Sequence, residues 1–281
     1  MNYCVGLIIY NPSLRELEFI NTYINSVDKV YIYDNSDVIH KEELAEILKT
    51  TNYEYFFNGK NEGISIPFNN MMKIAEKESM DYMIMLDQDS KIEKKGINKL
   101  KDIINGNSYK KVFSCNVIFE GERQTYPEKL KTIKFAITSG TVIDISYFNT
   151  LHGYDEKLFI DGVDRDFCLK LAEANEMIYR MNNVFLFQQL GNRPKNLLGI
   201  YEHSPIRNYY IFRNRLYLMD KYPNVFQGLI KFKSKQLSIL KQYMSILLFE
   251  KDKMDKFRFI KKAKNDYKKG KMYQIKKEGT E

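Results

Sequence analysis

The chain of 281 residues has no tryptophan, only 3 cysteines, and no apolar stretch that reaches the roughly 18 residues of a membrane-spanning helix. Cys4, Cys115 and Cys168 are odd in number and widely spaced, which excludes a disulfide framework and a zinc motif and favours a reducing compartment. The start of the chain lacks a basic leader before a long apolar core, so we expect no signal peptide. These absences predict a cytoplasmic protein.

Apolar residues make up 44% of the chain and aromatic residues 14%, which favours a sizeable core over disorder. Charge is unevenly placed, because residues 221–281 hold 17 Lys and Arg against 6 Asp and Glu, whereas the first 220 residues hold 27 against 30. A basic tail on a near-neutral body indicates a polyanionic partner, such as nucleic acid or an anionic membrane, or a tail that only keeps the protein soluble.

Short apolar runs alternate with segments of helical spacing in the first half of the chain. Strands are expected at 5–10, 29–33, 53–57 and 82–86, and helices at 14–24, 41–49 and 65–79. Further strands are expected at 112–119, 132–136 and 142–145, and further helices from 164 to about 175 and at 204–217. This alternation predicts an α/β fold whose sheet is mostly parallel.

The run Ile84-Met85-Leu86-Asp87-Gln88-Asp89-Ser90 carries the strongest chemical signal. Residues two apart in an extended strand point to the same side, so Asp87 and Asp89 are expected side by side at the strand end. Their mutual repulsion favours a bound cation, and carboxylate oxygens suit Mg²⁺ or Mn²⁺. Asn11, Asp34 and Asn61 also follow predicted strands, and polar strand ends that converge at one edge describe a binding crevice.

Several short motifs occur in a fixed order over roughly residues 3–220. They are Ile9-Tyr10-Asn11-Pro12, Asp34-Asn35-Ser36, Asn61-Glu62-Gly63-Ile64 with Asn69, Leu86-Asp87-Gln88-Asp89-Ser90, Ser139-Gly140-Thr141, Gly153-Tyr154-Asp155-Glu156, the segment from Asp161 to Asp166, and Arg207-Asn208-Tyr209-Tyr210 with Arg213-Asn214. Taken together, the chain resembles the inverting nucleotide-sugar glycosyltransferases of family 2, which have the GT-A fold. It is most similar to the branch usually called rhamnosyltransferases.

The resemblance implies a displacement at the anomeric carbon of a nucleotide-activated sugar, with a base for the acceptor hydroxyl and a cation for the leaving diphosphate. It implies Asp164 as the base. Asp161 and Asp166 would tune Asp164 or hold the acceptor, since crowded like charges raise the pKa of one of them. Ser139 and Thr141 are further candidates on the acceptor side, although small residues in a turn often serve only close packing.

The remaining implied residues bind the donor and the metal. The nucleotide-sugar set is Tyr10, Asn11, Asp34, Asn61, Gly63, Asp87, Gln88 and Arg213. Asp89, supported by Asp87, would hold Mg²⁺ or Mn²⁺. Arg213 would reach the diphosphate, or it is an exposed charge on an amphipathic helix.

The chain departs from the family pattern in two places. Many relatives carry Glu-Asp where this chain has Val163-Asp164, and aligning the second acid gives Asp164 the base position. Many relatives also carry a metal-binding His near a Leu-Gly pair, whereas here Gln188-Gln189 precedes Leu190-Gly191. His203, which lies downstream, is expected to substitute.

We expect a GT-A domain at 1–220 and a basic helical extension at 221–281. In this tail, apolar residues recur at helical spacing with lysines between them: Leu229, Phe232, Leu240, Met244 and Leu247, and Lys231, Lys233, Lys235 and Lys241. A basic amphipathic helix suits the anionic inner face of the plasma membrane. The alternative is that the apolar stripe packs on the catalytic domain or on a second copy in a homodimer.

The best interpretation is a transferase that moves L-rhamnose from dTDP-rhamnose to a hydroxyl of a lipid-linked or growing cell-surface polysaccharide. UDP-galactofuranose, UDP-glucose and UDP-galactose remain alternative donors, and a non-catalytic sugar-nucleotide-binding protein is an alternative class. No recognised nucleic-acid module accompanies the basic tail, so no nucleic-acid partner is expected. A nucleotidyltransferase would need a Gly-rich basic loop after the first strand, which Asn11-Pro12-Ser13-Leu14 does not supply.

Overall fold

The computed structural model describes residues 1–119, 130–188, 202–224 and 228–275. The chain divides into two compact units, which are described separately. The sheet unit comprises Met1–Asp155 and Lys170–Leu190, and the C-terminal unit comprises Glu156–Leu169 and Gly191–Glu281.

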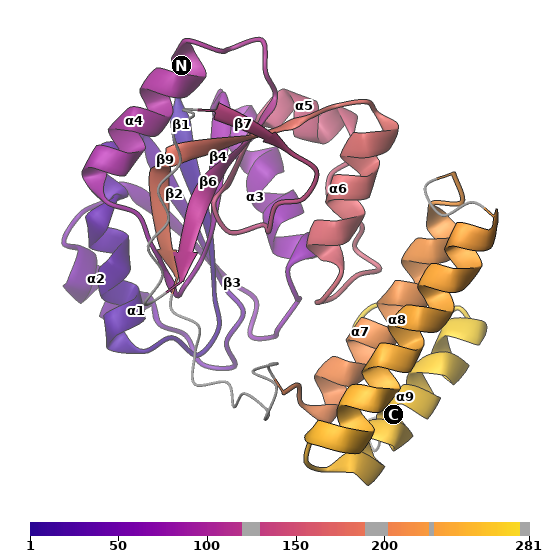
Figure 1. The fold of residues 1–281 in the computed structure, drawn as a ribbon. Helices are drawn as coiled ribbons and strands as arrows, with labels where there is room; N and C mark the ends of the chain where they lie inside the picture. The colour runs from indigo at the N-terminus through magenta and orange to yellow at the C-terminus, as the bar shows by residue number, and fades with distance from the viewer. Residues whose placement is uncertain (120–129, 189–201, 225–227, 276–281) are drawn as a thin grey trace. The chain divides into compact units, whose positions relative to one another are not determined.

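Within the described residues, the sheet unit is built on one mixed sheet, seen in Figure 1. Its order is β3 (Tyr53–Phe57), β2 (Lys29–Asp34), β1 (Tyr3–Ile9), β4 (Tyr82–Asp87), β8 (Thr141–Asp144), β6 (Val112–Phe119), β9 (Ile178–Gln188) and β5 (Ser90–Lys91), with β7 (Leu130–Ile133) paired to β9. The first four strands in this order are parallel, whereas β8 runs antiparallel to both of its neighbours. The prediction of an α/β fold is therefore confirmed, and the sheet is mixed.

Helices cover both faces of this sheet, as Figure 1 shows. They are α1 (Leu14–Glu18), α2 (Lys41–Leu48), α3 (Ser65–Lys77), α4 (Lys94–Asn105) and α5 (Ile145–Thr150). The central strands form the core because their side chains are almost all apolar: β1 and β4 are buried along nearly their whole length. A strand buried on both faces reads as a continuous apolar run, and this is why these strands were predictable.

One predicted helix is wrong in part. The helix expected at 14–24 ends at Glu18, and the chain continues as short 3₁₀ segments, Phe19–Thr22 and Ile24–Ser26. Tyr23 breaks the helix between them, with φ −132° and ψ −18°. Its ring is buried in the core, so packing of this side chain overrides the helical spacing.

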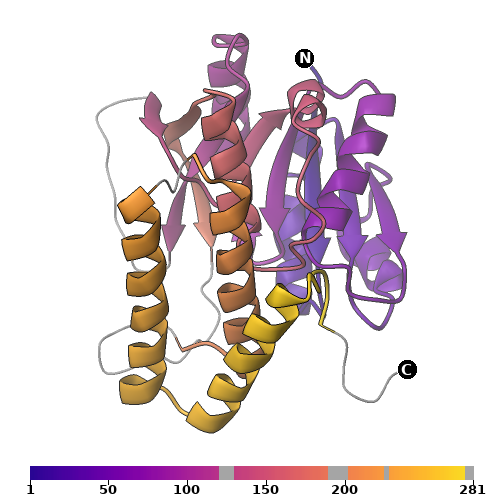
Figure 2. The same cartoon turned by 90° about the vertical axis from the view of Figure 1, so that its right-hand side faces the viewer.

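The C-terminal unit contains the helices α7 (Pro205–Lys221), α8 (Gly228–Phe249) and α9 (Lys253–Lys268), and the start of α6 (Val163–Glu173). Ser204 caps α7 by accepting a hydrogen bond from the Arg207 N–H, with Pro205 in the first turn. Figure 2 shows α8 and α9 joined by a short connection. The core includes Tyr209, Phe212, Ile246 and Ile260 among others, so α7 belongs to the same compact unit as the two helices after it.

The predicted tail helix is present as α8, but only part of its apolar stripe lies among the described side chains. Leu240, Met244 and Leu247 are exposed, while Ile246 is fully buried against the core of the unit. The side chains of Leu229, Phe232, Lys231, Lys233 and Lys235 lie outside the described residues. Among the helices that the structure describes, none has the length and apolar character needed to cross a membrane.

Candidate functional site

The carboxyl ends of three parallel strands meet at one edge of the sheet. Ile9 at the end of β1 is in register with Asp34 of β2, and Ile8 is in register with Asp87 of β4. The structure therefore brings Tyr10, Asn11, Asp34 and Asp87 to the same edge, as the alternating sequence pattern predicts.

Asp87 and Asp89 face one common side chain, the amide of Gln188 at the end of β9. Gln188 Nε2 lies 3.1 Å from Asp89 Oδ1 and 3.5 Å from Asp87 Oδ2. The pairing of β5 with β9 sets this contact, because Ser90 is directly opposite Gln188. Sequence reasoning noted Gln188 only as a neighbour of the Leu-Gly pair and assigned it no role. The strand that carries it was not predicted either.

The turn that contains Ser139 forms hydrogen bonds with the segment that carries the two aspartates. Ser139 Oγ accepts a hydrogen bond from the Asp87 N–H at 3.2 Å and lies 2.7 Å from Ser90 Oγ. Gly140 has φ +84°, and a Cβ there would lie 2.9 Å from Leu186 Cδ2, so only glycine fits. Thr141 Oγ1 donates to the Ile137 carbonyl at 2.6 Å. Ser139 thus holds the backbone of the Asp-x-Asp motif, and Thr141 closes its own turn.

Gln88 connects the Asp-x-Asp motif to the loop after β1. Its Oε1 accepts the Tyr10 N–H at 2.6 Å, and its Nε2 donates to Glu16 Oε1 at 3.0 Å. Glu16 also forms a capping box with Ser13 at the start of α1. Tyr10 is 46% exposed and Asn11 adopts φ +45°, so this loop presents side chains to solvent beside the two aspartates.

Asp34 is completely buried at the end of β2, inside a set of hydroxyl and ring donors. Its Oδ2 accepts the Tyr55 O–H at 2.5 Å and lies 2.9 Å from His40 Nδ1, while Oδ1 accepts the Ser36 N–H at 2.9 Å. Burial raises the pKa of the Asp34 carboxyl, but the hydrogen bonds from Ser36, Tyr55 and His40 outweigh burial and hold this pKa below its ordinary value. Sequence reasoning missed Tyr55 and His40, which complete this cluster.

The loop of Asn61 and Gly63 is ordered by amide contacts. Asn61 Oδ1 accepts the Gly63 N–H at 2.9 Å, and Gly63 has φ +77°. Asn35 joins this loop to β2, since its amide donates to the Gly63 carbonyl at 2.7 Å and accepts the Glu62 N–H at 3.1 Å. These bonds tie the predicted nucleotide loop to Asn35, the residue that follows Asp34 at the end of β2.

The acidic segment at the start of α6 belongs to the C-terminal unit. Asp161, which has φ +58°, forms a two-pronged ion pair with Arg207 at 3.1–3.3 Å. Asp166 is fully buried and accepts from Lys221 Nζ at 2.6 Å and from the Tyr222 O–H at 2.7 Å. Asp164 lies between them in the first turn of the helix and is half-buried. Because both flanking carboxylates have cationic partners, the crowding of like charges expected from the sequence is offset.

The sequence suggested that Arg213 either binds the diphosphate or is an exposed charge on an amphipathic helix. The structure agrees with neither prediction. Arg213 is fully buried, with its guanidinium 5.2 Å and 5.1 Å from the ring centres of Tyr209 and Tyr210. Its Nη1 donates to the Tyr273 carbonyl at 2.8 Å. The reason is that aromatic rings three and four residues earlier on α7 provide a cation–π environment inside the unit.

The metal ligands predicted from the sequence fall in different units. Asp87 and Asp89 are in the sheet unit, and His203, whose carbonyl accepts from the Asn208 amide at 3.2 Å, is in the C-terminal unit. Across the described ranges of the chain, no group of three or more His, Cys, Asp or Glu side chains gathers in a way that could hold a metal ion. The donor set at the sheet edge is two carboxylates and one amide, all oxygen-bearing groups of the kind that Mg²⁺ and Mn²⁺ bind.

Comparison with known proteins agrees with this geometry. No protein-family profile matches the chain. RfbF of Shigella flexneri, a curated dTDP-rhamnosyl transferase, is 28% identical over 236 residues, which span 76% of this chain and 79% of RfbF. The 1–349 fragment of S. aureus TarS, solved with UDP-GlcNAc, superposes with a TM-score of 0.60 at 14% identity and covers 98% of this chain and 94% of that fragment. GalNAc-T7 with UDP, GalNAc and Mn²⁺ gives a TM-score of 0.58 at 15% identity, over 78% of this chain and 48% of that protein.

These likenesses confirm the family resemblance and the GT-A fold that were expected from the sequence. The chain has the GT-A fold, and the curated relative RfbF is a dTDP-rhamnosyl transferase.

Proposed function

We propose that this chain transfers L-rhamnose from dTDP-rhamnose to a hydroxyl of a lipid-linked or growing cell-surface polysaccharide, with inversion at the anomeric carbon. The observation that carries the proposal is the pair Asp87 and Asp89, whose carboxylates face one point at the carboxyl edge of a GT-A sheet. The named activity of RfbF supports the rhamnose donor, and the UDP-GlcNAc bound to TarS supports a nucleotide diphosphate sugar in general.

The donor would bind across the ends of β1, β2 and β4. Tyr10 and Asn11 would contact the nucleotide from the exposed loop after β1, and Gln88 would fix that loop through its bond to the Tyr10 N–H. Asn61 and Gly63 would shape the opposite wall. Because Asp34 is buried behind Tyr55 and His40, its part would be to orient these two side chains toward the base or ribose, in addition to any direct contact.

A divalent ion, Mg²⁺ or Mn²⁺, would neutralise charge on the leaving diphosphate. Asp89 and Asp87 would hold it, and Gln188 would join them, because a half-turn of its amide puts an acceptor oxygen where the Nε2 donor now faces both carboxylates. GalNAc-T7, which has the same fold, was solved with Mn²⁺. His203 stays a further candidate ligand from the C-terminal unit.

Asp164 would accept the proton of the acceptor hydroxyl, since it is the half-buried acid in the first turn of α6. Asp161 and Asp166 would fix the segment in place through Arg207 and Lys221. Ser139 would act as a positioning residue for Asp87, and Thr141 would stabilise the same turn. Direct attack by the acceptor predicts a product of inverted anomeric configuration.

The basic C-terminal helices would hold the enzyme on the anionic inner face of the plasma membrane, as a peripheral protein. The exposed side chains Leu240, Met244 and Leu247 on α8 support this assignment. Assembly as a homodimer through the same face is the alternative, and sedimentation with and without anionic vesicles distinguishes the two.

The test is transfer from a panel of dTDP-rhamnose, UDP-GlcNAc, UDP-glucose, UDP-galactose and UDP-galactofuranose, with product anomers assigned by NMR. We expect turnover of dTDP-rhamnose that depends on Mg²⁺ or Mn²⁺. Asp89→Ala should lower the rate by about 10³-fold and Asp164→Asn by about 10²–10⁴-fold, while circular dichroism shows folded protein. Absence of turnover with every donor, together with salt-dependent retention of RNA or DNA, would refute the proposal.

A further inference from the structure

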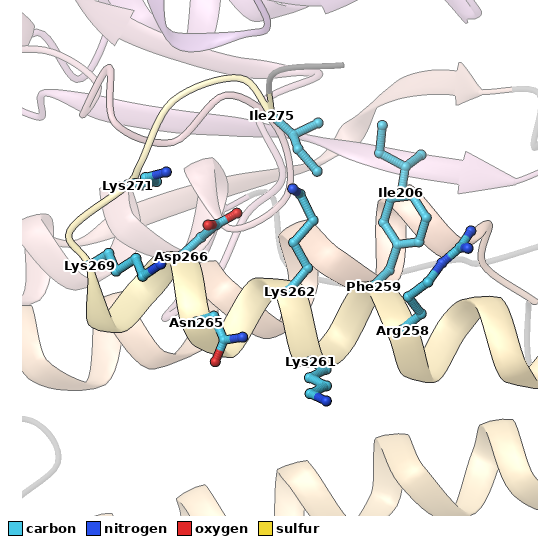
Figure 3. A pocket seen from close by; sticks show the side chains of 10 residues that line it. All are labelled: Ile206, Arg258, Phe259, Lys261, Lys262, Asn265, Asp266, Lys269, Lys271 and Ile275. Carbon is cyan, nitrogen blue, oxygen red and sulfur yellow. The ribbon is translucent and has the colours of Figure 1, made fainter. Parts of the chain in front are cut away.

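The C-terminal unit contains a pocket of about 660 Å³ along α9, shown in Figure 3. Among the described residues, its lining includes the cations Arg258, Lys261, Lys262, Lys269 and Lys271 and the carboxylate of Asp266. The pocket lies within one unit and contains no member of the proposed donor or metal site. The proposed donor reaction therefore gives this pocket no role.

One wall of this pocket is fixed by specific bonds. Gly270, with φ +66°, reverses the chain after α9, so the Lys271 N–H donates to the Asp266 carbonyl at 2.8 Å. Further along, the Ile275 N–H donates to the Tyr210 hydroxyl of α7 at 2.9 Å. The segment after α9 is thus tied back onto the helices, and a preformed wall lowers the ordering cost of binding a ligand.

The electrostatics of the pocket favour an anion. Its single described carboxylate, Asp266, already accepts the Tyr209 O–H at 2.9 Å. Arg258 pairs with Asp255 at 3.1 Å, but both side chains are more than half exposed, so this pair is weak. Several cations around a concave surface focus a positive potential, and guanidinium and ammonium groups are good donors to phosphate oxygens.

The pocket also has an apolar side, formed by Ile206, Phe259 and Ile275. Figure 3 shows these side chains on the same side of α9 as Lys262. Ile206 is 45% exposed although it is a large aliphatic residue. Inorganic phosphate would leave this side uncovered, whereas a phosphate ester with an apolar chain would use both the cations and the apolar side chains.

We propose that this pocket binds the phosphate or diphosphate group of an amphiphile whose apolar chain lies against Ile206 and Phe259. The site goes beyond the donor reaction, and its use for a lipid-linked acceptor would rest on the proposed function. Binding can be measured without any donor, so the two proposals fail separately.

The experiment uses the full chain, with binding of octyl phosphate, inorganic phosphate and octanol followed by NMR and calorimetry. The variant Lys262→Glu with Lys271→Glu reverses two pocket charges. Its matched control, Lys264→Glu with Lys268→Glu, reverses two exposed charges of α9 outside the pocket. We expect octyl phosphate to bind more tightly than inorganic phosphate, the pocket variant to weaken it roughly tenfold or more, and the control to change it about twofold at most.

Ile206→Ala tests the apolar side without removing charge, and it should weaken octyl phosphate while inorganic phosphate stays unchanged. If the pocket variant and the control variant weakened octyl phosphate binding equally, the proposal of a binding site in this pocket would be refuted, since binding would then follow net charge alone. Equal affinity for inorganic and octyl phosphate would contradict the proposal that the ligand is an amphiphile, and would indicate a site for free phosphate instead. If the double variant is unfolded by circular dichroism, Lys271→Gln, beyond the end of α9, replaces it with the same expected direction.

Discussion

At the carboxyl edge of the sheet, buried polar side chains are held by hydroxyl and amide donors, whereas in the C-terminal unit buried charges are held by opposite charges and aromatic rings. Asp34 illustrates the first arrangement, because its carboxylate accepts hydrogen bonds from the Tyr55 hydroxyl and the Ser36 N–H. Lys256 illustrates the second: it is 1% exposed and lies 2.6 Å from Glu202 and 3.0 Å from Glu250.

This difference in how the charged groups are held fits the two roles expected of the regions, which are ligand binding at the sheet edge and a stable packing of helices in the C-terminal unit. The proposed donor site must accept a charged ligand, and a neutral amide such as Gln188 can give way to that ligand more readily than a buried ion pair could. A bundle of helices with a small core has no such need, and it fixes its geometry with ion pairs that are costly to break. We therefore expect the buried charges of the C-terminal unit to serve its stability and the acidic groups at the sheet edge to serve the binding of a ligand.

The largest effect that would test this comparison comes from Lys256→Met. Removing this cation leaves the Glu202 and Glu250 carboxylates uncompensated, and the loss of one partner from a buried ion pair costs about 3–5 kcal/mol. We expect the free energy of unfolding of the C-terminal unit to fall by that amount, measured by hydrogen exchange of α8 and α9 amides.

The matched control is Lys264→Met, an exposed lysine on the same helix, which should change stability by less than about 0.5 kcal/mol. Amides of β1 and β4 should keep their protection in both variants. If Lys256→Met were as stable as the control, the buried ion pairs would not hold the unit and the comparison would fail.

A second, smaller effect concerns the sheet edge. Gln188→Leu removes the amide that faces Asp87 and Asp89, and we expect it to weaken Mn²⁺ binding roughly tenfold by electron paramagnetic resonance. Gln188→Glu adds a third carboxylate and should tighten Mn²⁺. Phe187→Leu, at the 44% exposed neighbour on β9, serves as the control. Unchanged Mn²⁺ affinity in Gln188→Leu would remove this residue from the metal site.

Sequence reasoning found the features that depend on local pattern. The strands β1, β2, β3 and β4 are apolar runs ended by polar residues, and both the pattern and the parallel pairing place their ends together. The motif Asp87-Gln88-Asp89 follows from the same logic. The structure also joins two predicted motifs that are far apart in the chain, the one that includes Asn69 and the one that includes Tyr154. The Asn69 amide donates to the Tyr154 carbonyl at 3.0 Å and accepts the Tyr154 N–H at 2.8 Å.

What sequence reasoning missed depends on contacts between distant segments. The strand β9 was not predicted, and its pairing with β6 shifts register between Cys115 and Asn116. Without β9 there was no way to see that Gln188 returns to the Asp-x-Asp motif 99 residues away in the chain from Asp89. Arg213 was misjudged for the same reason, since only the packed unit shows that this cation is enclosed.

The smallest effect is a pH dependence that reports on Asp34. Its pKa is lower in the folded protein than the ordinary value of 3.8, so its contribution to stability is present above that value and is lost as the pH falls through the folded pKa. Asp34→Asn cannot titrate and loses the charge that accepts from Tyr55 and His40. We therefore expect wild type to be more stable than Asp34→Asn at pH 7 and the difference to shrink below about pH 4 in urea unfolding of the sheet unit. A difference that stays constant down to pH 2 would show that the hydrogen bonds around Asp34 do not depend on its charge, and the sheet edge would then owe its order to shape alone.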